Sequence, residues 1–458
     1  MKNPFSDLSS TIVAPATAQG VGAIGVIRLS GKDAIVIAEK VFSGKKLTAQ
    51  KSHTIHYGFI VNKQGENVDE VMVSLFHAPK SFTMENVVEI STHGSPFVMN
   101  KIIETLVEAG ARMAKVGEFT MRAFMNGRIN LVQAEAVADI IHSENEAQQR
   151  IALQQMRGGY SADLQALRQQ LIDYLALLEL ELDFSEEDVE FAHRDRLFAL
   201  VHEIQTVIEP LIQSFKSGNA IKAGVPIVIA GKPNAGKSTL LNALLNEERA
   251  IVSDIAGTTR DTIEEVMHHN GIAFRFIDTA GLRESGDTIE QIGVAKAFAK
   301  MKLAQIVIYL FDVNTTSVED LQNELNALKV ADALVIPVAN KTELLTSTTL
   351  SEQFRAIPNI HFISALQKNG IEDLKHTLFG SVKIDPSGSI VTNLRHYEAL
   401  LKTNEVLNEV ITAFDNKLGG ELLAFHLREA LNELGSITGE VSNEEVLGSI
   451  FSRFCIGK

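Results

Sequence analysis

Cysteine is almost absent from this sequence, with Cys455 alone among 458 residues. A disulfide framework needs pairs of cysteines, so an internal one is excluded and a reducing compartment is favoured. Long apolar runs are also missing: none approaches the roughly 20 residues that a membrane-spanning helix needs, and the first residues carry no apolar signal-peptide core. We therefore expect a cytoplasmic protein with no membrane span.

Positive charge is in deficit. Lysine and arginine total 42 against 57 acidic residues, a net charge of −15. Proteins that bind nucleic acid without specificity are usually basic, so a nucleic-acid partner would need a local basic patch. A hydrophobic content of 45% and a charged content of 22% are ordinary for a soluble globular chain. The length predicts two to four domains.

The most informative motif is the stretch 231–238, which fits the phosphate-loop pattern G-x-x-x-x-G-K-S. It follows an apolar run at 225–230 that predicts a buried strand, and leucines at helical spacing come after it. This arrangement points backbone N–H groups and a helix N-terminus at phosphates. Lys237 would contact the β- and γ-phosphates, and the Ser238 hydroxyl would bind Mg²⁺. Taken alone, the pattern is also compatible with an ordinary Gly- and Asn-containing loop.

Further motifs, in a fixed order, favour a GTPase. An Asp-x-x-Gly element at 278–281 follows a strand-like run and suits the Mg²⁺ shell and the γ-phosphate. Between it and the phosphate loop, Thr259 in a polar loop would complete the Mg²⁺ shell only with a γ-phosphate present, as in a nucleotide-sensing switch. These elements define the phosphate side of the expected site.

The base side is predicted by two motifs that again follow apolar runs. In 340–343, the Glu343 carboxylate can accept two N–H bonds from guanine while Asn340 serves the other face of the base. GTPases usually carry Asp at the fourth position, so Glu343 places the carboxylate one methylene further out. The stretch 364–366 suits a last guanine contact. Together the motifs predict GTP rather than ATP.

Four segments are expected along the chain: mixed α/β residues 1–125, helical residues 126–220, a GTPase domain at 221–383 and helical residues 384–458. Helices on both sides of the GTPase unit predict a helical domain into which that unit is inserted, with two separate helical domains as the alternative. The stretch 20–25 matches G-x-G-x-x-G, but a β-branched run follows it where a dinucleotide fold needs a helix, so we reject that interpretation.

Several other stretches complete a resemblance along the whole chain. They are residues 11–14, 22–31, 81–83, 117–124, 130–136, the pair His93-Gly94 and the C-terminal Cys-Ile-Gly-Lys. With the GTPase motifs, they resemble the tRNA uridine-modification GTPases of the MnmE (TrmE) family. The resemblance implies a multidomain α+β and α/β fold: an N-terminal α/β folate-binding domain, a discontinuous all-α helical domain and an inserted parallel-sheet P-loop GTPase domain.

The resemblance also implies a function. It indicates a homodimer that acts with the FAD-dependent protein MnmG (GidA) on the wobble uridine of certain tRNAs, at C5. An aminomethyl or carboxymethylaminomethyl group would be installed with a one-carbon unit from a tetrahydrofolate derivative, in the 5-formyl or 5,10-methylene form. For tRNA, the cations Arg112, Lys115, Arg122 and Arg128 would form the local basic patch.

The motifs and the resemblance together assign a set of nucleotide contacts. The residues are Asn234, Ala235, Gly236, Lys237, Ser238, Thr239, Ser253, Asp254, Ile255, Ala256, Gly257, Thr258, Thr259, Asp278, Thr279, Ala280, Gly281, Asn340, Lys341, Glu343, Ser364, Ala365 and Leu366. Mg²⁺ would be held by Ser238 and Thr259. Related GTPases with asparagine in the phosphate loop bind K⁺ there, which implies Asn234, Ser253, Ile255 and Thr258 as K⁺ ligands.

Hydrolysis cannot use the common glutamine, because Leu282 follows the Asp-x-x-Gly element and cannot orient water. The resemblance assigns that role to Glu290, although by residue type alone Glu290 is a solvated residue at a helix start. No arginine finger is evident, so a K⁺ ion would offset the negative charge that develops in the transition state.

For folate, the resemblance implies Arg28, Glu89, Arg128 and Lys458. A pterin edge offers N–H donors to a carboxylate such as Glu89, and an anionic glutamate tail suits Arg or Lys. By residue type, Arg28 at a strand end is more often a structural ion pair, whereas Glu89 in an apolar strand needs a partner. Apolar residues before Cys455 predict a docked tail, which leaves a chemical role for Cys455 open.

Two other functions remain as alternatives. One is a GTP-dependent RNA or ribosome assembly factor of the related GTPase group. The other is a folate-dependent one-carbon transferase whose GTPase domain is only regulatory. The assembly factors typically carry an RNA-binding domain or a second GTPase domain after the first, whereas helices and the Cys-Ile-Gly-Lys tail follow here.

Overall fold

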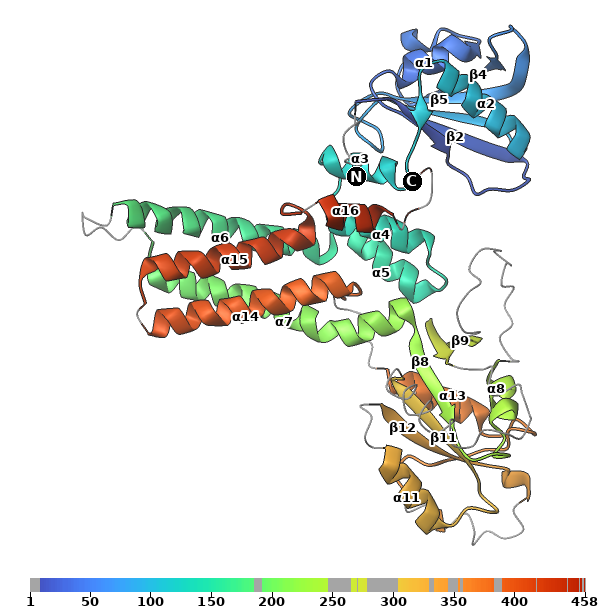
Figure 1. The fold of residues 1–458 in the computed structure, drawn as a ribbon, viewed down its shortest axis with the longest axis vertical. Coiled ribbons are helices and arrows are strands. Elements are labelled where there is room, and N and C mark those ends of the chain that lie inside the picture. The colour runs from blue at the N-terminus through green and yellow to red at the C-terminus, as the bar shows by residue number, and fades with distance from the viewer. Residues whose placement is uncertain are drawn as a thin grey trace. The chain divides into compact units, whose positions relative to one another are not determined.

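The computed structural model divides into two compact units. It describes residues 9–184, 192–245, 265–269, 271–277, 304–328, 333–344, 353–354, 357–382, 389–416, 418–442, 444–452, 454 and 457. The first unit comprises Met1–Ser143, Gln149–Ile208 and Glu398–Lys458, and the second comprises Glu144–Gln148 and Glu209–Tyr397 (Figure 1). Within the described residues, no helix is long and apolar enough to cross a membrane. The four domain boundaries expected from the sequence stay a prediction.

A seven-stranded sheet forms the N-terminal part of the first unit, in the order β3-β4-β5-β6-β2-β1-β7. Its strands are β1 (Ile12–Pro15), β2 (Ile24–Ser30), β3 (Phe42–Ser43), β4 (Thr54–Val61), β5 (Asn67–Phe76), β6 (Val87–His93) and β7 (Arg112–Met113). Neighbouring strands are antiparallel except β1 and β7. Gly25 lies inside β2, which confirms that the glycines at 20–25 do not open a helix.

Helices α1 (Ala34–Val41) and α2 (Pro96–Glu108) supply the apolar side chains that pack on this sheet. Alternate residues of the strands, such as Val71, Val73 and Leu75 of β5, point into that core. A short 3₁₀ helix, Leu47–Ala49, follows β3. The sheet then leads to α3 (Glu118–Met125), which packs against α16 (Glu444–Phe451).

Most of the rest of the first unit is helical. The further helices that lie wholly within it include α4 (Leu131–Ile141), α6 (Gly159–Asp183) and α15 (Gly420–Thr438). Others are divided between the residues of the two units: α5 (Glu146–Met156), α7 (Arg194–Ala223) and α14 (Leu394–Asp415). A capping box starts α4, because Asn130 and Gln133 each accept a hydrogen bond from the other's backbone N–H. The leucines at 164, 167, 171, 175 and 178 are all buried on α6, as predicted. Figure 1 shows α6 beside α15, which it contacts closely.

The second unit is built on a six-stranded sheet of order β13-β12-β11-β8-β10-β9. Its elements are β8 (Val225–Ala230), α8 (Lys237–Leu245), β9 (Glu265–His269), β10 (Ile272–Phe276), β11 (Ile306–Asp312), α11 (Val318–Leu328), β12 (Leu334–Asn340), a 3₁₀ turn (Thr342–Leu344), β13 (His361–Phe362) and α13 (Ile371–Gly380). All neighbouring strands are parallel except β9 and β10.

Both faces of this sheet are covered, as parallel sheets require. Ile306, Ile308 and Leu310 of β11 join a core with α8 and α13, whereas the alternate residues Val307 and Tyr309 join a second core with α11. The result is a doubly wound α/β domain, which confirms the expected fold class. Such sheets bind ligands outside the carboxyl ends of their strands.

Candidate functional site

The described nucleotide motifs converge at one edge of the second sheet. The phosphate loop follows β8, the central strand, while the Asn-Lys-Thr-Glu element follows β12 and Ser364-Ala365 follows β13. Because these strands are parallel, their carboxyl ends meet at the same edge. Residues that are far apart in the sequence therefore surround one site.

Glycine is required at two positions of the phosphate loop. Gly231 and Gly236 have φ values of +147° and +98°. A Cβ at Gly231 would lie 2.0 Å from the Leu310 carbonyl oxygen, and one at Gly236 would lie 2.3 Å from Asn340 Nδ2. Asn234 adopts a left-handed φ of +62°, which asparagine tolerates better than most residues. The sequence pattern thus reflects close packing of this loop against β11 and β12.

The loop lysine is fixed against the loop itself. Lys237 Nζ donates hydrogen bonds to the carbonyl oxygens of Gly231 at 2.8 Å and Lys232 at 2.9 Å. Burial lowers the pKa of Lys237 from its ordinary value. Lys237 is the first residue of α8. Its ammonium group and the N–H groups of the helix N-terminus can therefore bind the same anion.

Asn340 holds the phosphate loop to the base side of the site. Its Nδ2 donates to the Ala235 carbonyl oxygen at 2.8 Å, and its Oδ1 accepts from Ala365 N–H at 3.0 Å. The side chain is buried, at 3% exposure. From the sequence, Asn340 is expected only to face guanine, whereas in the structure it also clamps three segments together.

Glu343 carries a feature that points to a ligand. Its Oε2 is buried and has no hydrogen-bond partner among the described residues. A buried carboxylate oxygen without a donor is costly, and a guanine edge would supply the missing N–H groups. The residue lies in the one-turn 3₁₀ helix directly after β12.

Lys341 is positioned by Asp312, a residue that the sequence argument missed. Lys341 Nζ lies 2.8 Å from Asp312 Oδ2, and Asn314 donates its N–H and Nδ2 to Asp312 Oδ1. Burial acts to raise the pKa of Asp312, but the bonds from Lys341 and Asn314 hold it below its ordinary value. The sequence signal that could have found Asp312 is an acidic residue at the carboxyl end of β11, because the site is expected at that edge of the sheet.

The remaining described residues of the base side differ in exposure. Ser364 and Ala365 are buried at 1% and 3%, whereas Leu366 is 75% exposed. The turn is closed by backbone hydrogen bonds in both directions between Ser364 and Asn369. Ala365 is thus held where its N–H meets Asn340.

Many of the predicted nucleotide residues lie outside the described residues. These are Ser253, Asp254, Ile255, Ala256, Gly257, Thr258, Thr259, Asp278, Thr279, Ala280, Gly281 and Glu290. Ser238 and Thr239 lie in α8, directly after Lys237.

A second candidate site lies in the N-terminal sheet domain. A cavity of about 600 Å³ is lined by Glu89, Arg128, Phe82 and Lys80, among others. Arg28 and Glu89 are register partners on β2 and β6. Arg28 Nε donates to Glu89 Oε1 at 2.8 Å, and Nη2 lies 2.7 Å from the same oxygen in an ion pair. Glu89 therefore has the charged partner that a carboxylate in an apolar strand needs. Within the described residues, both contacts use Oε1 and not Oε2.

Phe82 brings the two cations of this site together. The Arg28 guanidinium lies 5.9 Å from the Phe82 ring centroid, and that of Arg128 lies 5.2 Å from it. Both distances suit cation–π contacts. The predicted residues Arg28, Glu89 and Arg128 are thus brought together around one aromatic ring.

The described part of the C-terminal tail is docked, as the sequence predicted. Phe451 and Phe454 are buried in a cluster with α3 and α4 residues. The Gly457 carbonyl oxygen accepts a hydrogen bond from Arg28 Nη1 at 3.4 Å, and a Cβ at Gly457 would lie 2.0 Å from the Pro15 carbonyl oxygen. Cys455 and Lys458 lie outside the described residues.

The basic patch predicted for tRNA is wrong for Arg122. Arg122 is only 1% exposed and pairs with Glu85 and Glu118. Arg112 also pairs with Glu118, at 2.6 Å. Arg122 is therefore not available as an RNA-facing cation, whereas the Arg112 side chain is 28% exposed.

The parallel sheet, the phosphate loop and the guanine-type motifs define a P-loop GTPase. A family model described as the MnmE helical domain matches residues 131–455, and one described as the GTP-binding protein TrmE N-terminus matches residues 11–128. The chain belongs to the MnmE family of tRNA modification GTPases.

Curated relatives share the whole length of the chain. The tRNA modification GTPase MnmE of Cytophaga hutchinsonii is 54% identical over 98% of both chains. That of Flavobacterium johnsoniae is 49% identical over 98% of this chain and 99% of the relative. Among solved structures, a point variant of Aquifex aeolicus Era bound to GDP·AlF4⁻ matches 40% of this chain and 66% of its own, at 26% identity and a TM-score of 0.27.

Proposed function

We propose that this GTPase is K⁺-activated and acts with the FAD-dependent protein MnmG to modify C5 of the wobble uridine in certain tRNAs. A tetrahydrofolate derivative in the N-terminal cavity would supply the one-carbon unit. The observation that carries the proposal is this cavity, where a carboxylate, an arginine and an aromatic ring meet. A homodimer located in the cytoplasm, with tRNA as substrate, completes the proposal.

GTP would lie at the carboxyl edge of the second sheet. The phosphate loop would hold the phosphates, Ser238 would bind Mg²⁺ with Thr259, and Glu343 would accept the guanine N–H groups. Asn234 offers a hard side-chain oxygen for K⁺, with Ser253, Ile255 and Thr258 as further ligands. A monovalent cation there would stabilise the negative charge that develops between the β- and γ-phosphates.

Hydrolysis requires a group that orients the attacking water. The water oxygen forms a bond to the γ-phosphorus while the bond to the β–γ bridging oxygen breaks, giving GDP and phosphate. Leu282 offers neither donor nor acceptor on its side chain. We assign the positioning of water to the Glu290 carboxylate, either directly or through a second water.

The folate site would use complementary ends of the cavity. Glu89 Oε2 would accept N–H groups of a pterin, and the Phe82 ring offers an apolar face beside them. The cations Arg128 and Lys80 suit the carboxylates of a glutamate tail. Lys458 would join from the tail that Arg28 anchors through Gly457. The volume of about 600 Å³ lies in the range of small-molecule sites.

Two variants separate the parts of this proposal. Arg28→Ala removes the partner of Glu89 and is expected to weaken binding of a tetrahydrofolate derivative and to lower wobble-uridine modification, with GTP turnover unchanged.

Glu290→Ala is expected to slow GTP turnover at least about 100-fold and to abolish modification, with folate binding intact. For both variants, calorimetry measures folate binding and phosphate release measures GTP turnover. Mass spectrometry of tRNA nucleosides from cells measures wobble-uridine modification.

Lys63→Ala is the matched control for Arg28→Ala, because Lys63 is a 64% exposed cation of the same sheet domain. Normal modification in cells that carry Glu290→Ala would show that GTP turnover does not drive the chemistry. Normal folate binding by Arg28→Ala would remove the folate assignment.

A further inference from the structure

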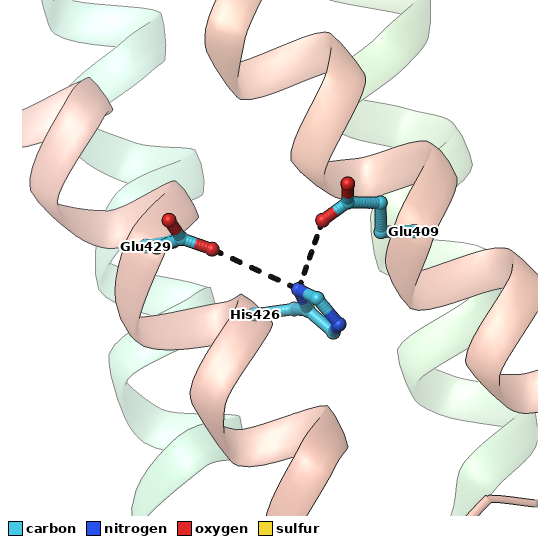
Figure 2. Close-up of side chains that lie close together, drawn as sticks. All are labelled: Glu409, His426 and Glu429. Carbon is cyan, nitrogen blue, oxygen red and sulfur yellow. Dashed lines mark ion pairs between the residues drawn. The ribbon is translucent and has the colours of Figure 1, made fainter.

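Two neighbouring helices of the first unit bring a histidine and two glutamates together. Glu409 lies on α14, six residues before its end at Asp415, and His426 lies on α15, six residues after its start at Gly420. Glu429 is three residues beyond His426, on the same face of α15. Figure 2 shows both carboxylates directed at the His426 ring, one from each helix.

The distances place three potential ligand atoms around one point. His426 Nδ1 lies 3.0 Å from Glu409 Oε2 and 3.8 Å from Glu429 Oε2. All three ligand atoms lie within 4.8 Å of one another. The His426 side chain is 15% exposed, whereas those of Glu409 and Glu429 are 58% and 49% exposed, so the site opens to solvent on its carboxylate side.

The hydrogen bonding of this cluster is incomplete. His426 Nδ1 is buried and has no hydrogen-bond partner among the described residues. Glu409 Oε2 is near enough for an ion pair but is not aligned as a hydrogen-bond acceptor. A cation bound between Nδ1 and the two carboxylates would give this nitrogen the partner that it lacks.

Nor do the lysines and arginines of these two helices neutralise the carboxylates. Arg395 contacts His396, Lys402 pairs with Glu433 at 3.8 Å, and Arg428 pairs with Glu179 at 2.7 Å. Within the described residues, two half-exposed negative groups therefore converge on one imidazole without a lysine or arginine of these helices paired to either.

We propose that Glu409, His426 and Glu429 form a binding site for a divalent transition metal, with Zn²⁺ as the best match. One imidazole nitrogen and two carboxylate oxygens are ordinary Zn²⁺ ligands, at about 2.0–2.2 Å. In a tetrahedral site such bonds put ligand atoms roughly 3.3–3.5 Å apart. The observed distances of 3.0 and 3.8 Å from His426 Nδ1 lie on either side of this range.

Such an ion would join α14 to α15 and keep one position for water. The site belongs to the first unit, whereas the phosphate loop and the base-side residues belong to the second. We therefore assign it a structural role in the helical hairpin, independent of the proposed use of GTP and folate. A metal that binds only the folded hairpin would stabilise it by mass action.

The test is zinc binding by the full-length, nucleotide-free protein after removal of metals with a chelator. Calorimetric titration with Zn²⁺ should give one site per chain that is weakened at least about tenfold in Glu409→Gln and in His426→Gln. X-ray absorption spectroscopy of the bound zinc should show only nitrogen and oxygen ligands. A sulfur ligand would instead indicate binding at Cys455. Zn²⁺ should also raise the unfolding temperature of the wild type but not of the variants.

Glu405→Gln is the matched control, because Glu405 is exposed on α14 one turn before Glu409. This substitution removes the same charge as Glu409→Gln, and the variant should bind Zn²⁺ with the affinity of the wild type. Glu409→Gln changes a half-exposed group, so the test does not depend on a variant that disrupts the fold. Equal affinity of wild type, Glu409→Gln and His426→Gln, or no binding to the wild type at about 100 μM Zn²⁺, would show that the three side chains are close neighbours without a metal site.

Discussion

Replacing Glu343 by glutamine should weaken guanine-nucleotide binding by roughly 10- to 150-fold. The reasoning starts from Glu343 Oε2, which is buried without a donor in the described structure. Guanine offers two N–H groups, and a carboxylate accepts both. The amide oxygen of glutamine accepts one of them, while its NH₂ faces the other. The loss of one charge-assisted hydrogen bond costs about 1.5–3 kcal/mol, which gives the stated range.

Calorimetry with GDP measures this effect without interference from hydrolysis. A second nucleotide, xanthosine diphosphate, tests the direction of the hydrogen bonds, because it carries a carbonyl where guanine has its amino group. The glutamine NH₂ can donate to that carbonyl, so the preference for GDP over xanthosine diphosphate should shrink or reverse. Glu319→Gln, at an exposed position of α11, should leave both affinities unchanged.

The result that would refute the reasoning is a GDP affinity of Glu343→Gln within about twofold of the wild type. Such a result would mean that Glu343 does not read the base. An unchanged preference between the two nucleotides would lead to the same conclusion. The glutamate side chain, which is longer than the usual aspartate, would then place the Glu343 carboxylate out of reach of the guanine N–H groups.

Two further predictions concern the phosphate loop. GTP turnover should be at least about tenfold faster in K⁺ than in Na⁺ if a cation at Asn234 offsets transition-state charge, and equal rates of phosphate release would contradict the K⁺ site. Gly236→Ala should lower GDP affinity at least about tenfold, because its Cβ would lie 2.3 Å from Asn340 Nδ2 at a φ of +98°. Gly380→Ala, with nothing within 4 Å of the new Cβ, is the control, and equal GDP affinity of both variants would show that the loop tolerates a side chain.

Much of the fold follows from patterns that are local in sequence. The leucine stripe of α6, the strand before the phosphate loop and the helix after it were predictable because each has its own period of apolar residues. Asn130 and Gln133 mark the start of α4 in the same local way. Such signals need no knowledge of the partner surface.

Contacts between distant elements were not predictable. The Arg28–Glu89 pair depends on the register of β2 against β6, and the clamping by Asn340 depends on backbone groups 105 and 25 residues away. Arg122 seemed a surface cation from its residue type, yet it is buried between two carboxylates. Glu181 on α6 likewise pairs with Arg194 on α7, a contact that no local pattern encodes.

The candidate sites also differ in whether local sequence patterns could predict them. The convergence of the phosphate loop, the Asn-Lys-Thr-Glu element and Ser364-Ala365 was predictable, because motifs of fixed spacing follow parallel strands. The cluster on α14 and α15 has no such motif, since Glu409 and His426 come from separate helices. Their proximity depends on how α14 and α15 lie against each other, which no local pattern encodes.

The most direct test of the whole account is the state of the wobble uridine in tRNA from cells that lack this protein. Mass spectrometry of the nucleosides should show that the C5 aminomethyl or carboxymethylaminomethyl group is lost, and that the wild-type gene on a plasmid restores it. A fully modified wobble uridine in the deletion strain would contradict the account.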